Sequence, residues 1–200
     1  MGIAAAIVVG YLLGTFPSAD LVTRIATRGE LDIRAIGSGN PGTLNAIQSI
    51  GTAWGVVVLV LDVTKGVAAG LLGEFLGGDV AAYLGATASV AGHVFPVWTG
   101  FRGGKGVATS AGACIAVFPA YVPIDFVVAM LGELRSRRAL VGTQIGCAIW
   151  IVAAGLWWGF GWSNLWAPAP SAWLLVFSVA GSAMILWAFW HADRTSSGSG

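Results

Sequence analysis

A glycine-rich loop at residues 100–106 has the pattern best suited to chemistry in this sequence. It reads GFRGGKG and places Arg102 and Lys105 among four glycines, in a chain of which only 10% is charged. Successive glycines let backbone N–H groups converge on one point, and a neighbouring lysine adds a mobile positive charge. Such a loop is suited to binding a phosphate group. The alternative is a short cytoplasmic loop with the positive charges usual on that side of a membrane.

A second glycine-rich loop, GSGNPG at residues 37–42, offers groups of a similar kind. Ser38 supplies a hydroxyl and Asn40 an amide, while Gly37 and Gly39 leave the backbone free to present its N–H groups. This loop is a second candidate site for an anion.

Neither loop meets the full requirements of a nucleotide-binding motif. Residues 37–42 fit G-x-G-x-x-G, but no strand precedes them and no βαβ unit surrounds them, which excludes dinucleotide binding. The segment before Lys105 is not a P-loop, because Thr99 replaces the first glycine and Gly106 replaces the Ser or Thr that would hold magnesium.

Other polar residues could support these loops. Asn45 and Gln48 follow the first loop, three residues apart, and could line the same site. Asp62 and Lys65 are also three apart, inside an apolar run, and can pair on one helical face. Charges within a span mark functional or packing sites, and we expect a structural pair or support for the loops. His93, near the end of another apolar run, is expected to be structural.

Residues at two further span ends have local explanations. Asp20 is expected to cap the segment that follows it, and His191 could be an ordinary interface residue. Cys114 and Cys147 lie in apolar runs, which argues against a disulfide or a metal site. The sequence has no HExxH, CxxC or GxSxG pattern, so no metal or cofactor is expected.

The composition is that of an integral membrane protein. The chain is 56% apolar and has ten tryptophans and a mean hydropathy of +0.82. We predict an all-α fold with about seven transmembrane helices, forming a single domain over residues 1–194, with residues 195–200 as a linker or expression tail. The predicted spans are residues 3–23, 52–76, 80–97, 107–122, 124–134, 140–160 and 171–190.

The positions of the cations predict how these spans are oriented. Nine of the ten Lys and Arg residues fall in alternate connections, and only Lys65 lies inside a span. By the positive-inside rule these connections are cytoplasmic, which puts the N-terminus outside and the C-terminus inside. Both glycine-rich loops then face the cytoplasm. Four tryptophans gather at the predicted outer interface: Trp157, Trp158, Trp162 and Trp166.

Three motifs together resemble the PlsY-type glycerol-3-phosphate acyltransferases. Residues 32–45 (DIRAIGSGNPGTLN) resemble the first signature of that family, and residues 61–66 (LDVTKG) resemble its intramembrane Asp/Lys element. Residues 92–110 (GHVFPVWTGFRGGKGVATS) resemble the second signature almost throughout. In this order and spacing, the motifs account for over half of the chain, about residues 11–119.

The resemblance implies a membrane enzyme with seven spans, an outer N-terminus and an active site that faces the cytoplasm of a bacterial cell. The family transfers a fatty acyl group from acyl phosphate to the sn-1 hydroxyl of glycerol 3-phosphate, which gives lysophosphatidic acid. It is described as lacking a His–Asp catalytic pair, with substrate phosphate as a candidate base. The expected partners are these substrates and membrane lipids, without nucleic acid, and a monomer is expected.

The motifs also carry roles to individual residues. Ser38 and Asn40 would help to hold glycerol 3-phosphate, and Lys105 would bind phosphate with the backbone of Gly103 and Gly104. His191 would match the histidine of the third signature. The catalytic candidates are therefore Ser38, Lys105 and His191, and the substrate-binding candidates are Gly37, Gly39, Asn40, Asn45, Gln48, Arg102, Gly103, Gly104 and Gly106.

The chain departs from the family pattern in two places. Gln48 stands where the first signature has an Arg, and a neutral amide replaces a bidentate charged clamp on phosphate. Such a loss costs about 2–4 kcal/mol of transition-state binding. His191 lacks the expected His-x-x-Asn spacing of the third signature. The arginines of the 133–138 loop are candidates to replace the clamp: Arg135, Arg137 and Arg138.

Two other functions remain open on the sequence. A weakened family member could act as a binding or partner protein. A small transporter of phosphorylated solutes would instead show an internal repeat and helices broken at the membrane midplane. The sequence has no such repeat, and most of its polar groups lie at the predicted cytoplasmic edge.

Overall fold

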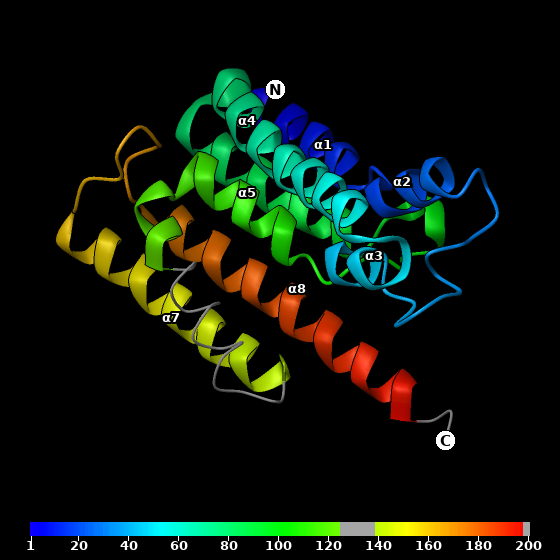
Figure 1. The fold of residues 1–200 in the computed structure, drawn as a ribbon. Helices are drawn as coiled ribbons and strands as arrows, with labels where there is room; N and C mark the ends of the chain where they lie inside the picture. Colours follow the sequence, from blue (N-terminus) through cyan, green and yellow to red (C-terminus); the bar gives the residue numbers. More distant parts are fainter. Residues whose placement is uncertain (125–138, 198–200) are drawn as a thin grey trace.

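The computed structural model describes residues 1–124 and 139–197, and its backbone is helical with no strand in those ranges (Figure 1). This confirms the predicted all-α class. The helices are α1 (Gly2–Gly14), α2 (Ser18–Ala26), α3 (Thr43–Ile50), α4 (Thr52–Val94), α5 (Val107–Val117), α7 (Ala139–Phe160) and α8 (Ala172–Ser197), with short 3₁₀ turns η1 (Val97–Thr99) and η2 (Pro119–Tyr121).

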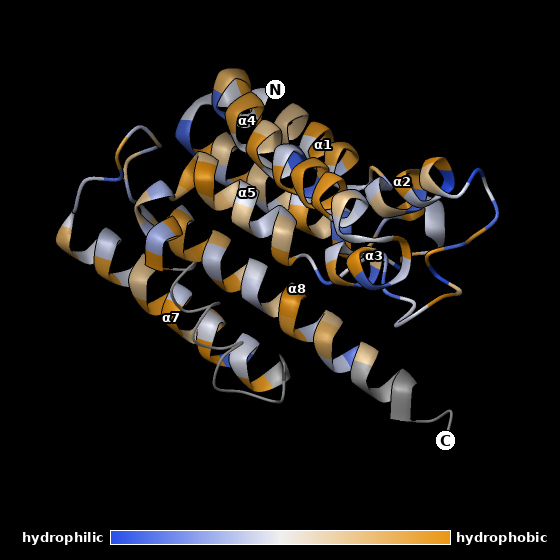
Figure 2. Ribbon diagram, in the orientation of Figure 1, coloured by the Kyte–Doolittle hydropathy of each residue, from blue (hydrophilic) through white to orange (hydrophobic). Residues whose placement is uncertain are grey.

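Four described stretches are long and apolar enough to cross a membrane: Gly2–Ala26, Thr52–Thr99, Val141–Phe160 and Ala172–Ala192. Val107–Val117 is a shorter apolar helix. Large hydrophobic side chains are exposed on the outer faces of these helices, as expected where lipid replaces water. Figure 2 shows hydrophilic residues concentrated in the loops around α2 and α3.

The predicted span over residues 3–23 falls within the apolar stretch Gly2–Ala26, but that stretch is formed by two helices. Helix α1 ends at Gly14, and the separate helix α2 begins at Ser18. Pro17 explains the break, since it lacks an N–H donor and disfavours helical backbone at the residue before it. The resulting turn at residues 15–17 is important because it forms one wall of the polar site described below.

Helix α4 contains the predicted second and third spans as two arms of a hairpin. The backbone leaves helical geometry at Gly77 and Gly78, where Gly78 has a φ of 72°. A side chain at Gly73 would collide with the carbonyl of Ala81, so the first arm (52–76) and the second arm (79–94) lie in close antiparallel contact. Small residues allow this approach, as in other membrane helix pairs.

Helices α1 and α5 flank this hairpin. Gly10 and Gly14 of α1 approach Gly85 and Ser89 of the second arm, so α1 runs parallel to that arm. Residues of α5 pack in parallel along the first arm, where Gly112 lies against Val63. The directions of α1, the two arms and α5 therefore alternate as the charge pattern predicted.

Helices α7 and α8 form a second pair beside this group (Figure 1). They pack through Trp150, whose ring lies 5.1 Å from Phe177 and against Gly181. The predicted span 107–122 is shorter than expected, because α5 ends at Val117 and Pro119 opens η2. The predicted span 124–134 lies outside the described residues, apart from its first residue.

Candidate functional site

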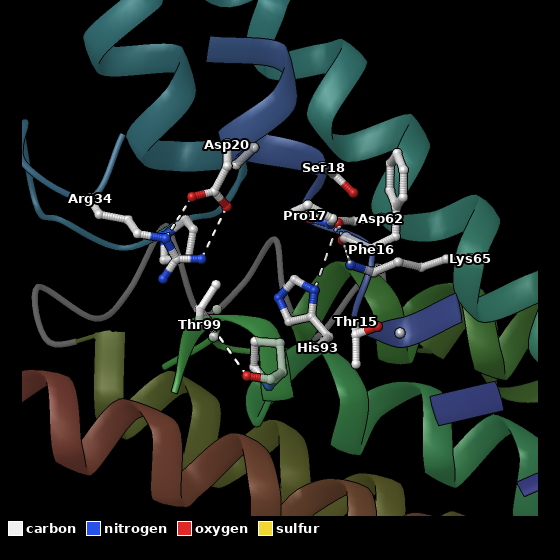
Figure 3. A pocket seen from close by; sticks show the side chains of 16 residues that line it. Thr15, Phe16, Pro17, Ser18, Asp20, Arg34, Asp62, Lys65, His93 and Thr99 are labelled. Carbon is white, nitrogen blue, oxygen red and sulfur yellow. Dashed lines mark hydrogen bonds and ion pairs between the residues drawn. The ribbon is translucent and has the colours of Figure 1, made fainter. Parts of the chain in front are cut away.

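A small polar cavity of about 20 Å³ lies where α1 turns into α2 (Figure 3). As it stands, that volume has room for about one water molecule. Four parts of the chain enclose it: the turn and the start of α2, the two arms of α4, the loop before α5, and residues from the 34–41 segment. The lining residues are Gly14, Thr15, Phe16, Pro17, Ser18, Ala19, Asp20, Arg34, Pro41, Asp62, Lys65, His93, Pro96, Thr99, Gly103 and Gly104.

One wall of the cavity is a buried cluster of three ionisable side chains. Asp62 and Lys65, one turn apart on the first arm, are paired with Lys65 Nζ 2.9 Å from Asp62 Oδ1. His93 reaches the same carboxylate oxygen from the second arm, with Nδ1 at 3.7 Å. All three side chains are buried. Charges buried among apolar helices are costly unless they are paired. The α4 hairpin meets this requirement, because its two arms bring Lys65 and His93 to the same carboxylate.

The cluster also holds the turn between α1 and α2. Lys65 Nζ donates a hydrogen bond to the carbonyl oxygen of Phe16 at 3.2 Å. From the other side, the indole Nε1 of Trp98 donates to the Thr15 hydroxyl at 3.0 Å. The turn is therefore fixed to the first arm of α4 and to η1 at the same time.

A second ion pair lies at the more open side of the cavity. Arg34 Nε and Nη2 donate to the two carboxylate oxygens of Asp20, at 2.6 and 3.0 Å. Arg34 Nη1 donates to the carbonyl oxygen of Arg102 at 2.5 Å. About a quarter of each side chain in the pair is exposed. Arg34 thus connects α2, the segment after it and the glycine-rich loop.

The glycine-rich loop packs tightly on His93. The N–H groups of Gly103 and Gly104 donate to the carbonyl oxygens of Val94 and His93, each at 3.1 Å. A Cβ at Gly103 would collide with the His93 carbonyl oxygen, and one at Gly104 with the imidazole Nε2. These two amides therefore already have acceptors within the fold, in contrast to the phosphate-facing amides expected from the sequence.

The first glycine-rich loop is held by Asn45, which is buried at the start of α3. Its Nδ2 donates to the carbonyl oxygens of Ile33 and Ile36, and its Oδ1 accepts from the Ser38 N–H at 3.0 Å. Gly37 sits against the same amide with a φ of 57°, a conformation that favours glycine. Asn45 positions the loop and does not line the cavity, so that direct substrate contact by this residue stays a prediction.

The other predicted residues do not line the cavity. Of the predicted set, only Gly103 and Gly104 line it. Lys105 Nζ lies 4.2 Å from the ring centroid of Phe189 on α8, and His191, further along α8, stacks on Trp187 with centroids 5.0 Å apart. The remaining members are exposed or half-buried in the two loops and α3, or cap α5: Gly37, Ser38, Gly39, Asn40, Gln48, Arg102 and Gly106.

Sequence reasoning missed Arg34 as a cavity residue and gave only supporting roles to Asp20, Asp62, Lys65 and His93. A usable signal was present, since a charge inside an apolar span is a functional candidate by default. The candidate replacements for the missing clamp, at 135, 137 and 138, lie outside the described residues. Within the described ranges, no three His, Cys, Asp or Glu side chains are grouped as a metal ion would require.

Comparisons of the sequence and of the structure with known proteins point to the same family. A family model described as "Glycerol-3-phosphate acyltransferase" matches residues 4–195. A protein of that name from Allorhizobium ampelinum is 41% identical over 74% of each chain. Glycerol-3-phosphate acyltransferase 2 from Moorella thermoacetica is 40% identical over 72% of this chain and 73% of its own length.

Two crystal structures of PlsY (YgiH), described as an integral membrane glycerol 3-phosphate acyltransferase, share the fold. The glycerol 3-phosphate form is 29% identical, with a TM-score of 0.76 over 99% of this chain and 94% of that chain. The lysophosphatidic acid form is 27% identical, with a TM-score of 0.78 over 99% of this chain and 93% of that chain.

Proposed function

Because the chain belongs to the glycerol-3-phosphate acyltransferase family, a family of integral membrane enzymes, we propose that it transfers a fatty acyl group from acyl phosphate to the sn-1 hydroxyl of glycerol 3-phosphate. In this reaction the hydroxyl oxygen attacks the acyl carbon and the carbon–oxygen bond to phosphate breaks. The hydroxyl proton leaves with inorganic phosphate, and the products are lysophosphatidic acid and phosphate.

One observation carries this proposal beyond family membership: the cavity combines two cations with two carboxylates at one end of an apolar bundle. Arg34 and Lys65 can neutralise phosphate, while Asp62 can accept hydrogen bonds from glycerol hydroxyls. Acyl phosphate is already activated, so orientation and neutralisation of phosphate charge can supply most of the rate enhancement.

The predicted residues outside the cavity complete the proposed site at its rim. Ser38 and Asn40 would hold glycerol 3-phosphate from the first loop, and Lys105 would neutralise phosphate from the second. The contact of Lys105 with Phe189 supports a shared site, because it brings the second loop beside the end of α8 that carries His191. His191 would orient phosphate at that side.

An apolar groove of about 520 Å³ fits the acyl chain of the donor. It lies between α1, the second arm of α4 and α8, and its lining includes Tyr11, Ala91 and Met184. Tyr11 lies one helical turn from Thr15, and Ala91 two residues from His93, so the groove begins close to the polar cavity. We place the hydrocarbon chain in this groove, with its phosphate end toward the cavity.

We place the enzyme in the bacterial inner membrane, and the charge pattern supports a site open to the cytoplasm. Both glycine-rich loops lie at the end of the bundle that the positive-inside rule assigns to that side. The reaction would need no cofactor, because acyl phosphate is itself an activated acyl donor. We propose that the enzyme acts as a monomer.

The test is turnover by the purified enzyme with palmitoyl phosphate and glycerol 3-phosphate, measured as phosphate release and as lysophosphatidic acid formed. Palmitoyl-CoA replaces the donor in a parallel reaction, and Lys105→Ala is the control variant. We expect turnover with palmitoyl phosphate alone and a loss of about a hundredfold or more in Lys105→Ala. Binding of glycerol 3-phosphate without turnover would instead identify a weakened family member.

A further inference from the structure

The cavity is electrically balanced before any substrate enters it. Asp62 pairs with Lys65, and Asp20 pairs with Arg34, so each strong cation in the lining faces a carboxylate. A phosphate group adds about two negative charges at neutral pH. For a cation of the cavity lining to pair with that phosphate, Arg34 or Lys65 must change its partner.

The two pairs differ in how readily they can exchange. Lys65 and Asp62 are almost fully buried, with side-chain exposures of 6% and 2%. Arg34 and Asp20 are 26% and 25% exposed at the open side of the cavity. Breaking a buried pair leaves an uncompensated charge among apolar helices, whereas a carboxylate at an exposed edge can turn to water. Exchange at Arg34 is thus the less costly route.

The backbone donors of the glycine-rich loop are occupied, and the side chain at position 48 is uncharged. Arg102 and Lys105 are charged but do not line the cavity. The N–H groups of Gly103 and Gly104 already donate to backbone carbonyls. Gln48 is neutral, exposed and outside the cavity lining. Arg34 is the guanidinium that lines the cavity, and its two-pronged geometry suits carboxylate and phosphate alike.

We propose that Arg34 is a phosphate-binding residue of this site, and that Asp20 holds the guanidinium in the cavity until substrate phosphate displaces the carboxylate. The inference rests on the proposed function and names the residue that supplies the clamp missing at position 48. The bond from Arg34 Nη1 to the Arg102 carbonyl keeps the guanidinium beside the glycine-rich loop while its other two nitrogens change acceptor.

A purely structural ion pair makes a different prediction. Removal of either partner would then disturb the same contacts and would lower stability and activity to a similar extent. A pair that opens for substrate is asymmetric, because loss of Arg34 removes a ligand contact and loss of Asp20 removes a competitor.

The experiment compares Arg34→Gln, Arg34→Lys and Asp20→Asn with the wild type in the full chain. The KM for glycerol 3-phosphate, kcat and Tm are measured for each. We expect Arg34→Gln to raise KM by about tenfold or more, and Arg34→Lys, which keeps the charge and loses the fork, to fall between it and the wild type. Asp20→Asn is expected to leave KM unchanged or lower it. An unchanged KM in Arg34→Gln, or an equal rise of KM in Asp20→Asn, overturns the proposal.

A binding measurement separates this inference from the proposed reaction. The Tm of each variant is recorded with inorganic phosphate and with glycerol 3-phosphate, which requires no turnover. We expect both ligands to raise the Tm of the wild type and of Asp20→Asn, and to have little effect on Arg34→Gln. If the wild type binds these ligands but does not transfer an acyl group, the reaction is wrong and the role of Arg34 stands. If wild type and Arg34→Gln gain equal Tm, the role of Arg34 is wrong whatever the reaction.

Discussion

Gly104 lies so close to His93 that a Cβ at position 104 would collide with the imidazole Nε2, and the Gly104 N–H donates to the His93 carbonyl oxygen at 3.1 Å. The glycine is therefore required by packing, whatever the loop does for phosphate. His93 in turn approaches Asp62, which pairs with Lys65. The position of the glycine-rich loop thus depends on charges buried in the α4 hairpin.

Gly104→Ala should displace either the loop or the imidazole. Overpacking of this kind costs about 1–3 kcal/mol, and we expect a clear fall in Tm together with a loss of acyl transfer. Gly155→Ala in α7 is the matched control, because no atom lies within 4 Å of the Cβ it would add. Tm and turnover of the two variants are compared in the same detergent. If Gly104→Ala and Gly155→Ala have the same Tm and turnover, the contact with His93 does not determine the position of the loop.

Removal of one member of the Asp62–Lys65 pair should be more damaging than removal of both. Asp62→Asn leaves the Lys65 ammonium buried without a carboxylate, which costs about 3–5 kcal/mol in comparable sites. Asp62→Asn combined with Lys65→Met removes both charges and should recover much of the lost Tm. Asp79→Asn, at the exposed turn of the hairpin, serves as the control for loss of an acidic group.

If the double variant is as unstable as Asp62→Asn, the pair does not act as a unit. A recovery of Tm without a recovery of turnover has a different meaning. It would show that the charges act on the substrate or on the loops, beyond holding the hairpin together.

Hydropathy could predict most of the helices because each span must be apolar over its own length. The arms of α4, α7 and α8 follow from that rule. It could not predict the break at residues 15–17, since one proline changes the mean hydropathy of a span little while it ends the helix. The turn matters for the candidate site, because it supplies Thr15 and Phe16 to the contacts that frame the cavity.

The site was harder to predict than the fold. Glycine-rich patterns drew attention to backbone donors, but at Gly103 and Gly104 the backbone geometry serves packing. Arg34 is 14 residues from Asp20, and only the folded chain shows that the two pair across the cavity. Spacing reveals partners one helical turn apart, such as Asp62 and Lys65, and leaves long-range partners hidden.

Asn45 should be a stability determinant of the first glycine-rich loop. Asn45→Ala removes the partners of two carbonyl oxygens and of the Ser38 N–H, with a cost of about 1–3 kcal/mol. We expect a lower Tm and faster proteolysis of the 33–38 segment. Gln48→Ala, three residues away and exposed on the same helix, should change neither. If Asn45→Ala is cleaved no faster than the wild type, Asn45 does not have this role.

Cysteine labelling in intact cells can test the predicted orientation. Cys114 and Cys147 are both buried, so that background labelling by a membrane-impermeant maleimide should be low. Glu30→Cys and Ser163→Cys introduce exposed thiols at opposite ends of the bundle. We expect labelling of Ser163→Cys in intact cells, and of Glu30→Cys only after the membrane is opened. The reverse pattern would place the polar cavity outside the cell.

A guanidinium restored at position 48 should matter most when Arg34 is absent. In the wild type, Arg34 already brings a bidentate cation to the cavity, so Gln48→Arg should change kcat/KM by no more than about threefold. In the Arg34→Gln background the same substitution should raise kcat/KM by about tenfold or more, because it replaces the bidentate contact with phosphate that Arg34→Gln removes.

Gln48→Lys in the same background is the control for charge alone, since it adds a cation without the fork. The measurement is kcat/KM for glycerol 3-phosphate in the four combinations of positions 34 and 48, with Gln48→Lys as a fifth variant. Additive effects would mean that the two positions act on different steps, and a large gain from Gln48→Arg in the wild type would mean that Arg34 does not supply the clamp. A recovery confined to the Arg34→Gln background is expected if one phosphate group can be held from either position.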